Sequence, residues 1–143
     1  MIQLIIWIKP FARYVLIAWI ITMITVSSIP SLPTLKIHTE RCDIRLDYLI
    51  HFCEYGLLAF ITYLSFTGKE FKMNMKKYLS LTIALIAFAV LDEYHQKLIP
   101  GRSFNVKDIQ SNIIGIITAL GFCIYLFRLI ASRLAKRDLK SHQ

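Results

Sequence analysis

Long apolar runs separated by short polar connections dominate the chain. Four of these runs approach the roughly 20 residues that an α-helix needs to cross a bilayer at about 1.5 Å of rise per residue. We predict membrane-spanning helices at Phe11–Ile29, Leu46–Phe66, Tyr78–Leu98 and Ile109–Ala131. The expected fold class is therefore an all-α integral membrane protein, a four-helix transmembrane bundle built as a single domain over residues 1–143.

The third run is the least regular of the four. Its uncharged part, Tyr78–Leu91, has only 14 residues, which as a helix would span about 21 Å, less than the hydrocarbon core. The polar residues Asp92–Gln96 must then lie within the last turns of a membrane helix. The fourth run has no charged residue from Ile109 through Phe127 and needs no such extension.

The first run has an alternative interpretation. Lys9 and Arg13 precede the apolar stretch Tyr14–Val26, which ends in small residues at Val26-Ser27-Ser28, and this order is also typical of a secretory signal peptide. An even number of spans agrees better with the distribution of charge described below.

The composition indicates that lipid is the solvent for much of this chain. Hydrophobic residues make up 56% of it and the mean hydropathy is +0.54, more than a soluble domain needs for its core. The net charge of +8 comes from short lysine and arginine clusters between apolar runs, without a recognition module for DNA or RNA, so no nucleic-acid partner is expected. Cys42, Cys53 and Cys123 form no CxxC pair.

The positive charges also predict the orientation. Eleven lysines and arginines lie before or at the start of the first run, between the second and third, or at the end of the fourth and after it. Only 6 lie in the other two connections. The positive-inside rule therefore places both termini in the cytoplasm and the first and third connections outside.

Polar residues at helical spacing mark the outer halves of three predicted helices. An acidic residue at the centre of a membrane helix costs about 2.5–3.5 kcal/mol, so several of them should face one another or a wet cavity rather than lipid. Glu93 points about 100° away from the stripe of its own helix. The three stripes are Asp47, His51, Glu54 and Tyr55, then Asp92, His95 and Gln96, then Asp108, Ser111, Asn112 and Gly115.

The third connection is predicted to turn tightly. Pro100-Gly101 suits the two central positions of a β-turn, because proline fixes φ and glycine permits a positive φ. Asn105 can then cap the fourth helix, with Asp108 in its first turn beside the positive end of the helix dipole. Arg102 would lie above the acids, where it could pair with Asp92, Glu93 or Asp108, or hold a phosphate or carboxylate.

These residues carry a family resemblance. The run Asp92-Glu93-Tyr94-His95-Gln96, the run Pro100-Gly101-Arg102-Ser103 and the later Asp108, Asn112 and Gly115 together resemble the signature of the VanZ-like family of bacterial membrane proteins. Ser28-Ile29-Pro30 and the set Asp47, His51 and Tyr55 are similar to other recurring positions of that family, over roughly Ser28–Gly121. The basic residue that usually follows the aspartate is here Tyr48.

The resemblance implies a multi-pass protein of the bacterial cytoplasmic membrane, in a family linked to resistance against teicoplanin and related lipoglycopeptide antibiotics. It implies no defined reaction. The partners expected from it are membrane lipids and a lipid-linked envelope precursor or a lipoglycopeptide.

The candidate ligand-binding residues have structural alternatives. Asp108 can simply compensate the helix dipole, Asn112 and Gly115 can serve helix packing, and His51 beside Asp47 can be a satisfied interfacial pair. For Asp92, Glu93, Gln96 and Arg102 we favour a functional role, because packing alone does not explain so many costly groups in one place. The full candidate set is Asp47, His51, Glu54, Asp92, Glu93, Gln96, Arg102, Asp108 and Asn112.

Three functions fit this set. The first is a non-enzymatic envelope protein that binds its ligand in an outer polar pocket. The second is an enzyme acting on a lipid-linked substrate, with Asp92 or Glu93 as general base, His51 or His95 as proton carrier and Arg102 on a phosphate. No cofactor is expected, although a divalent metal could sit among His51, Glu54, Asp92 and Glu93. The third, a small transporter, has only four spans and no visible inverted repeat.

Overall fold

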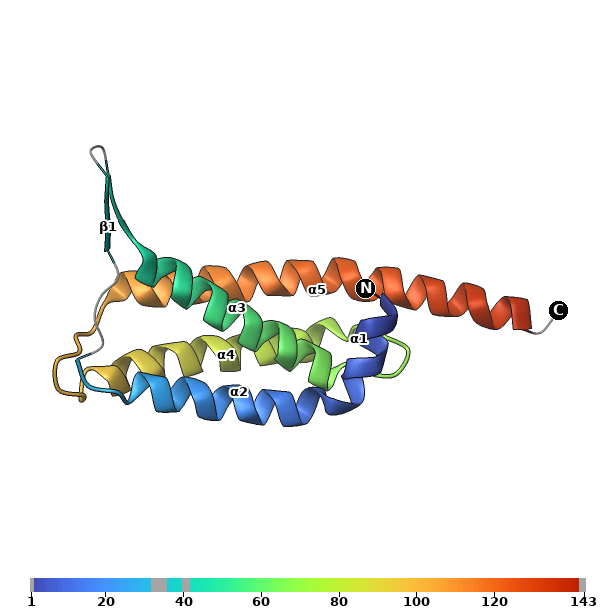
Figure 1. The fold of residues 1–143 in the computed structure, drawn as a ribbon. Coiled ribbons are helices and arrows are strands. Elements are labelled where there is room, and N and C mark those ends of the chain that lie inside the picture. The colour runs from blue at the N-terminus through green and yellow to red at the C-terminus, as the bar shows by residue number, and fades with distance from the viewer. Residues whose placement is uncertain (1, 32–35, 40–41, 142–143) are drawn as a thin grey trace.

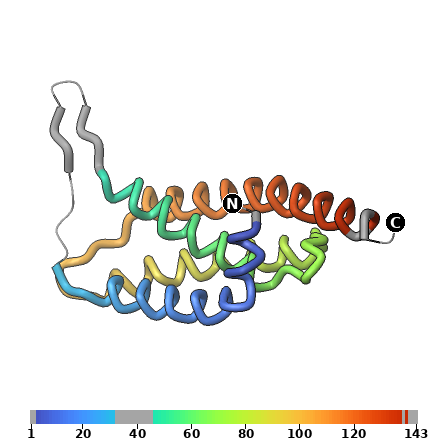
Figure 2. The backbone as a smooth tube through the Cα atoms, turned by 45° about the vertical axis from the view of Figure 1, so that its right-hand side comes forward, coloured from blue at the N-terminus to red at the C-terminus, as the bar shows by residue number. Residues whose placement is uncertain are grey.

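The computed structural model describes residues 2–31, 36–39 and 42–141. The long helices lie side by side, with α1 and the C-terminal end of α5 at one end of the bundle and a β-hairpin at the other (Figure 1). A view turned by 45° shows the same arrangement (Figure 2). In chain order the elements are α1 (Ile2–Ile8), the 3-10 turn η1 (Lys9–Phe11), α2 (Ala12–Ser27), β1 (Lys36–Thr39), β2 (Cys42–Arg45), α3 (Leu46–Phe66), α4 (Met75–Gln96) and α5 (Val106–Ser141).

Each predicted span corresponds to one long helix. The second prediction coincides with α3, and the first exceeds α2 by one residue at its start and two at its end. Upstream of α2 the chain stays helical but changes direction at η1, which carries Pro10 in its first turn. Proline lacks the backbone N–H and its ring crowds the preceding turn, so a straight helix cannot continue through this point.

Among the described residues, three helices are long and apolar enough to cross a membrane, and they are Gln3–Ser27, Leu46–Phe66 and Val106–Arg137. The third predicted span, which corresponds to α4, is not among them. Its 22 residues include Lys76 and Lys77 near the start and Asp92 and Glu93 near the end. The chain is a membrane protein by these helices, whereas a membrane position for α4 needs an argument beyond hydropathy.

Helix α5 runs from Val106 to Ser141, whereas the predicted fourth span was Ile109–Ala131. Its 36 residues correspond to about 54 Å, well beyond the thickness of a hydrocarbon core. The extension contains leucine, alanine, lysine and arginine, which favour helix even where the apolar run has ended. Figure 1 shows this last part of α5 reaching past the other helices.

The tightest helix contact joins α3 and α5. A Cβ atom placed on Gly115 would lie 2.3 Å from the backbone oxygen of Phe52, and Gly115 also faces the backbone of Gly56. Small residues let membrane helices approach in this way. Side chains fully buried around the contact include Tyr55, Leu58, Tyr63, Ile116, Cys123 and Phe127.

A two-stranded hairpin joins α2 to α3, in a connection where no strand was predicted. Strands β1 and β2 pair antiparallel, from Lys36 opposite Arg45 to Thr39 opposite Cys42. The body of the fold is therefore helical, as expected, with one short hairpin at the end that also carries the α4–α5 turn.

The predicted turn between α4 and α5 is confirmed. Gly101 has a φ of +77°, and the Arg102 N–H donates to the carbonyl oxygen of Ile99 at 3.1 Å, which closes a β-turn around Pro100-Gly101. The Ser31 N–H donates to the carbonyl oxygen of Pro100 at 3.1 Å. The segment after α2 is thus held against this turn.

Candidate functional site

Asp92 links three helices through its carboxylate. Ser27 Oγ at the end of α2 donates to Oδ1 at 2.6 Å, and the Tyr55 hydroxyl on α3 donates to Oδ2 at 3.1 Å. Gln96, one turn further along α4, donates from Nε2 to the same Oδ2 at 3.1 Å. Hydrogen bonds to an ionised acceptor are stronger than neutral ones, so these three donors offset the cost of placing the charge there.

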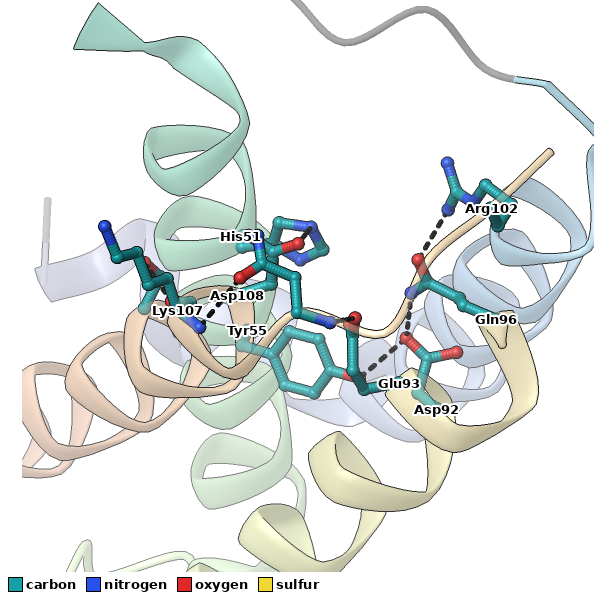
Figure 3. A network of polar contacts seen from close by, with 10 residues as sticks. His51, Tyr55, Asp92, Glu93, Gln96, Arg102, Lys107 and Asp108 are labelled. Atoms are coloured by element: carbon teal, nitrogen blue, oxygen red, sulfur yellow. Dashed lines mark hydrogen bonds and ion pairs between the residues drawn. The ribbon is translucent and has the colours of Figure 1, made fainter. Parts of the chain in front are cut away.

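Arg102 reaches Asp92 only through an intermediary. Its Nη2 donates to the Gln96 side-chain oxygen at 2.8 Å, and the Gln96 amide nitrogen donates in turn to Asp92. Figure 3 shows this relay from Arg102 through Gln96 to Asp92. Of the two alternatives considered for Arg102, the direct pairing with Asp92, Glu93 or Asp108 is not among the described contacts. An amide can both donate and accept, so Gln96 fits between a cation and an anion.

Glu93 lies on a different face of α4 from Asp92 and contacts the N-terminus of α5. Its side chain is 1% exposed, and Oε1 accepts a hydrogen bond from the Asn105 N–H at 2.7 Å. Asn105 itself caps α5, as predicted, with Oδ1 accepting from the Lys107 N–H at 3.1 Å. A carboxylate at this position also meets the positive end of the α5 dipole.

His51 and Asp108 join α3 to α5. His51 Nε2 lies 3.7 Å from Asp108 Oδ2, and both side chains are largely buried. Figure 3 shows the two facing each other across the helix boundary, with the Tyr55 ring below them toward Asp92 and Glu93. Asp108 therefore has a partner on another helix in addition to its place in the first turn of α5.

Asn112 on α5 is fully buried, with 0% of its surface exposed. Neither its amide oxygen nor its amide nitrogen has a hydrogen-bond partner among the described residues. The same holds for Oε2 of Glu93, Nε of Arg102 and Nδ1 of His51. A buried polar group without a partner costs about 1–3 kcal/mol, so these atoms mark places where water or a ligand would be held.

The remaining predicted residues lie around this core. Asp47 is half-buried in the first turn of α3. Glu54, also half-buried, lies within electrostatic reach of Asp92 and Arg102. His95, considered as a proton carrier, is half-buried, and none of the described contacts joins its side chain to these residues.

The proposed metal ligands His51, Glu54, Asp92 and Glu93 do not come together as a metal centre. Among the described residues, no group of three or more histidine, cysteine, aspartate or glutamate side chains is arranged to hold a metal ion. His51 lies beside Asp108 and Glu93 caps α5, so the two point to different helix contacts.

Ser27 was missing from the candidates drawn from the sequence. From the sequence, Ser27 was considered only as part of a signal-peptide cleavage site. Its spacing gives no indication of a contact with Asp92, which lies 65 positions away. Tyr55 was on the predicted stripe but not among the binding residues. We call the full set the polar cluster: Ser27, His51, Tyr55, Asp92, Glu93, Gln96, Arg102, Asp108 and Asn112.

A comparison with protein families identifies the chain. The family model described as VanZ/LLP1 matches residues 7–129. The chain belongs to the VanZ/LLP1 family. The VanZ/LLP1 match extends past the segment Ser28–Gly121 that carried the resemblance, and it includes every residue of the polar cluster. No curated protein and no solved structure gives a match.

Proposed function

We propose that this chain is a bacterial cell-envelope protein whose polar cluster lies on the outer side of the cytoplasmic membrane. There it binds a lipid-linked envelope precursor or a lipoglycopeptide, and in this way lowers the action of teicoplanin-type antibiotics. The proposal assigns α2, α3, α4 and α5 to the membrane as a single domain, with both termini in the cytoplasm.

Two features support this orientation. The more positive loops and tails lie at the end of the bundle where α1 begins, as the positive-inside rule requires for a cytoplasmic end. The acids of α4 are compensated by donors from α2, α3 and α5, which reduces the cost of carrying them into the membrane. Helix α4 can therefore cross beside its neighbours despite its low hydropathy.

The observation that carries the binding proposal is the set of buried polar atoms without partners. Arg102 Nε and the Asn112 nitrogen can donate, and Glu93 Oε2 and the Asn112 oxygen can accept. A guanidinium is suited to a phosphate or carboxylate, and the amide and carboxylate are suited to sugar or peptide groups. Envelope precursors and lipoglycopeptides present these groups together.

The test is antibiotic susceptibility in a sensitive bacterial host. Wild type, Arg102→Ala, Glu93→Gln and Ser111→Ala would be expressed at matched membrane levels and the inhibitory concentration of teicoplanin measured. Ser111 is the control, because its hydroxyl donates to the Lys107 carbonyl of its own helix at 3.0 Å. We expect wild type and Ser111→Ala to raise that concentration severalfold and the other two to lose most of the increase. Full resistance in all variants would remove the polar cluster from the function.

An enzymatic role has one observation in its favour. A carboxylate beside one imidazole nitrogen orients a histidine, and the Asp108–His51 pair leaves Nδ1 of His51 without a partner among the described residues. If the protein is an enzyme, the purified wild type should convert an added lipid-linked precursor to a product. His51→Asn should abolish this conversion while binding of the precursor remains. Unchanged precursor after long incubation would leave binding as the role.

A further inference from the structure

A pocket of about 490 Å³ lies at the opposite end of the bundle from the polar cluster. It is formed where η1 and the start of α2 meet the end of α3. Cations and hydroxyls line it together with an aromatic and an aliphatic side chain. The lining residues are Lys9, Pro10, Arg13, Tyr14, Ile17, Ser65 and Thr67.

The charge around this pocket is positive, and the Lys9 ammonium lies 5.7 Å from the centroid of the Phe71 ring. Lys69 and Arg13 are the charged groups that act on Lys9, so three cations share one region. Glu70, the acid nearest in sequence, lies 2.7 Å from Lys72 and is paired there. Within the described part of the chain, no carboxylate lies within ion-pair distance of Lys9, Arg13 or Lys69.

The Thr67 hydroxyl completes a site for an anion, whereas the Ser65 hydroxyl donates to the Ile61 carbonyl oxygen at 2.7 Å. Thr67 Oγ1 accepts from the Tyr78 hydroxyl at 2.5 Å, which leaves the Thr67 proton available for a ligand. The side chains of Thr67 and Ser65 are both buried. The partial negative charge at the C-terminus of α3 is compensated, because Lys77 Nζ donates to the Phe66 carbonyl oxygen at 2.6 Å. An anion entering here meets donors and cations rather than a bare carbonyl.

Exposed apolar side chains of α2 adjoin the pocket. Tyr14 and Ile17, which line it, are 73% and 58% exposed, and Ile21 and Ile24 continue the exposed apolar face of α2. An acyl chain attached to a bound phosphate could therefore lie along α2. Free phosphate would use the cations but not this apolar face.

We propose that Lys9, Arg13 and Lys69, with the Thr67 hydroxyl, bind the phosphate of an anionic membrane lipid whose acyl chain lies on Tyr14 and Ile17. The site does not use the polar cluster, but its placement in the cytoplasmic leaflet rests on the orientation proposed above. It would anchor the bent junction between α1 and α2 to the cytoplasmic leaflet, where anionic lipids attract basic residues.

The test measures lipid retention by the full chain. The protein would be purified from nanodiscs of phosphatidylcholine containing phosphatidylglycerol, and the bound phosphatidylglycerol counted by native mass spectrometry. The pocket variant is Lys9→Ala/Arg13→Ala/Lys69→Ala. Its matched control, Lys76→Ala/Arg133→Ala/Lys136→Ala, removes the same charge from exposed positions outside the pocket. A third variant, Lys9→Arg/Lys69→Arg, keeps the charges.

We expect retention to fall about tenfold or more in the pocket variant and to stay within about twofold of wild type in the control and the arginine variant. Equal losses in the pocket variant and its control would overturn the proposal, because general surface charge would then explain binding. Undiminished retention in the pocket variant would overturn it too. Inorganic phosphate that competed as well as phosphatidylglycerol would overturn the assignment to lipid.

Discussion

At the scale of single residues, the polar cluster is organised around Asp92. One carboxylate receives donors from three segments, at Ser27, Tyr55 and Gln96, and so ties α2 and α3 to α4. The stabilisation depends on the negative charge, because all three neighbours donate to it. Removing the carboxylate would leave three buried donors without an acceptor.

Asp92→Ala should therefore destabilise the protein by about 2–4 kcal/mol, because a partly buried charged acceptor with three donors is lost. Thermal unfolding of the purified protein in detergent would measure it. Ser111→Ala serves as the control and should change stability by less than about 0.5 kcal/mol. If Asp92→Ala unfolded at the same temperature as wild type, the three hydrogen bonds would not be what holds the helices together.

The sequence predicted much of the polar cluster but few of its pairings. Helical spacing placed Asp92 and Gln96 on one face, and the turn around Pro100-Gly101 placed Arg102 above them. The relay through Gln96 could not be predicted. Spacing along a helix does not fix the distance from the Arg102 guanidinium to Asp92 well enough to tell a contact with the carboxylate from a contact with the Gln96 amide. Ser27 was missed because its partner lies on a helix distant in sequence.

At the scale of helices, hydropathy predicted where each long helix lies but not all of its ends. Helix α3 begins and ends as predicted, since polar connections flank it on both sides. Helix α5 runs on to Ser141 because helix-forming residues follow the apolar run without a glycine or proline. The hairpin of β1 and β2 was not predicted because four-residue strands give too short a pattern.

The contact between α3 and α5 leads to a prediction at Gly115. A methyl group there would lie 2.3 Å from the Phe52 carbonyl oxygen, so the two helices would have to separate. Gly115→Ala should cost about 1–3 kcal/mol, in the range of other overpacked contacts. Gly121 is the matched control on the same helix, because a Cβ there meets nothing within 4 Å.

Thermal unfolding of the two alanine variants would compare them directly. Gly121→Ala should be neutral or more stable by up to about 1 kcal/mol, because alanine favours helix over glycine. Equal stability of the two variants would mean that α3 and α5 do not approach closely enough at Gly115 for a Cβ to contact the Phe52 oxygen.

At the scale of the whole molecule, the two ends of the bundle differ in chemistry. One end gathers Asp92, Glu93 and Asp108 with their partners. The other gathers lysines and arginines around α1, the α3–α4 connection and the tail of α5. In the proposed function these ends lie on opposite sides of the membrane, which requires α4 to cross.

Cysteine labelling tests this assignment together with ligand binding. In a background without Cys42, Cys53 and Cys123, single cysteines would replace Ser103 and Lys69, both exposed and in the connections at the two ends of α4. A membrane-impermeant thiol reagent would be added to intact cells, with and without teicoplanin. The rate of labelling at each position would then be compared before and after permeabilisation.

We expect the cysteine at position 103 to be labelled in intact cells, teicoplanin to slow this labelling, and the cysteine at position 69 to be labelled only after permeabilisation. Labelling of both positions from the same side would contradict this assignment, because α4 would then not cross the membrane.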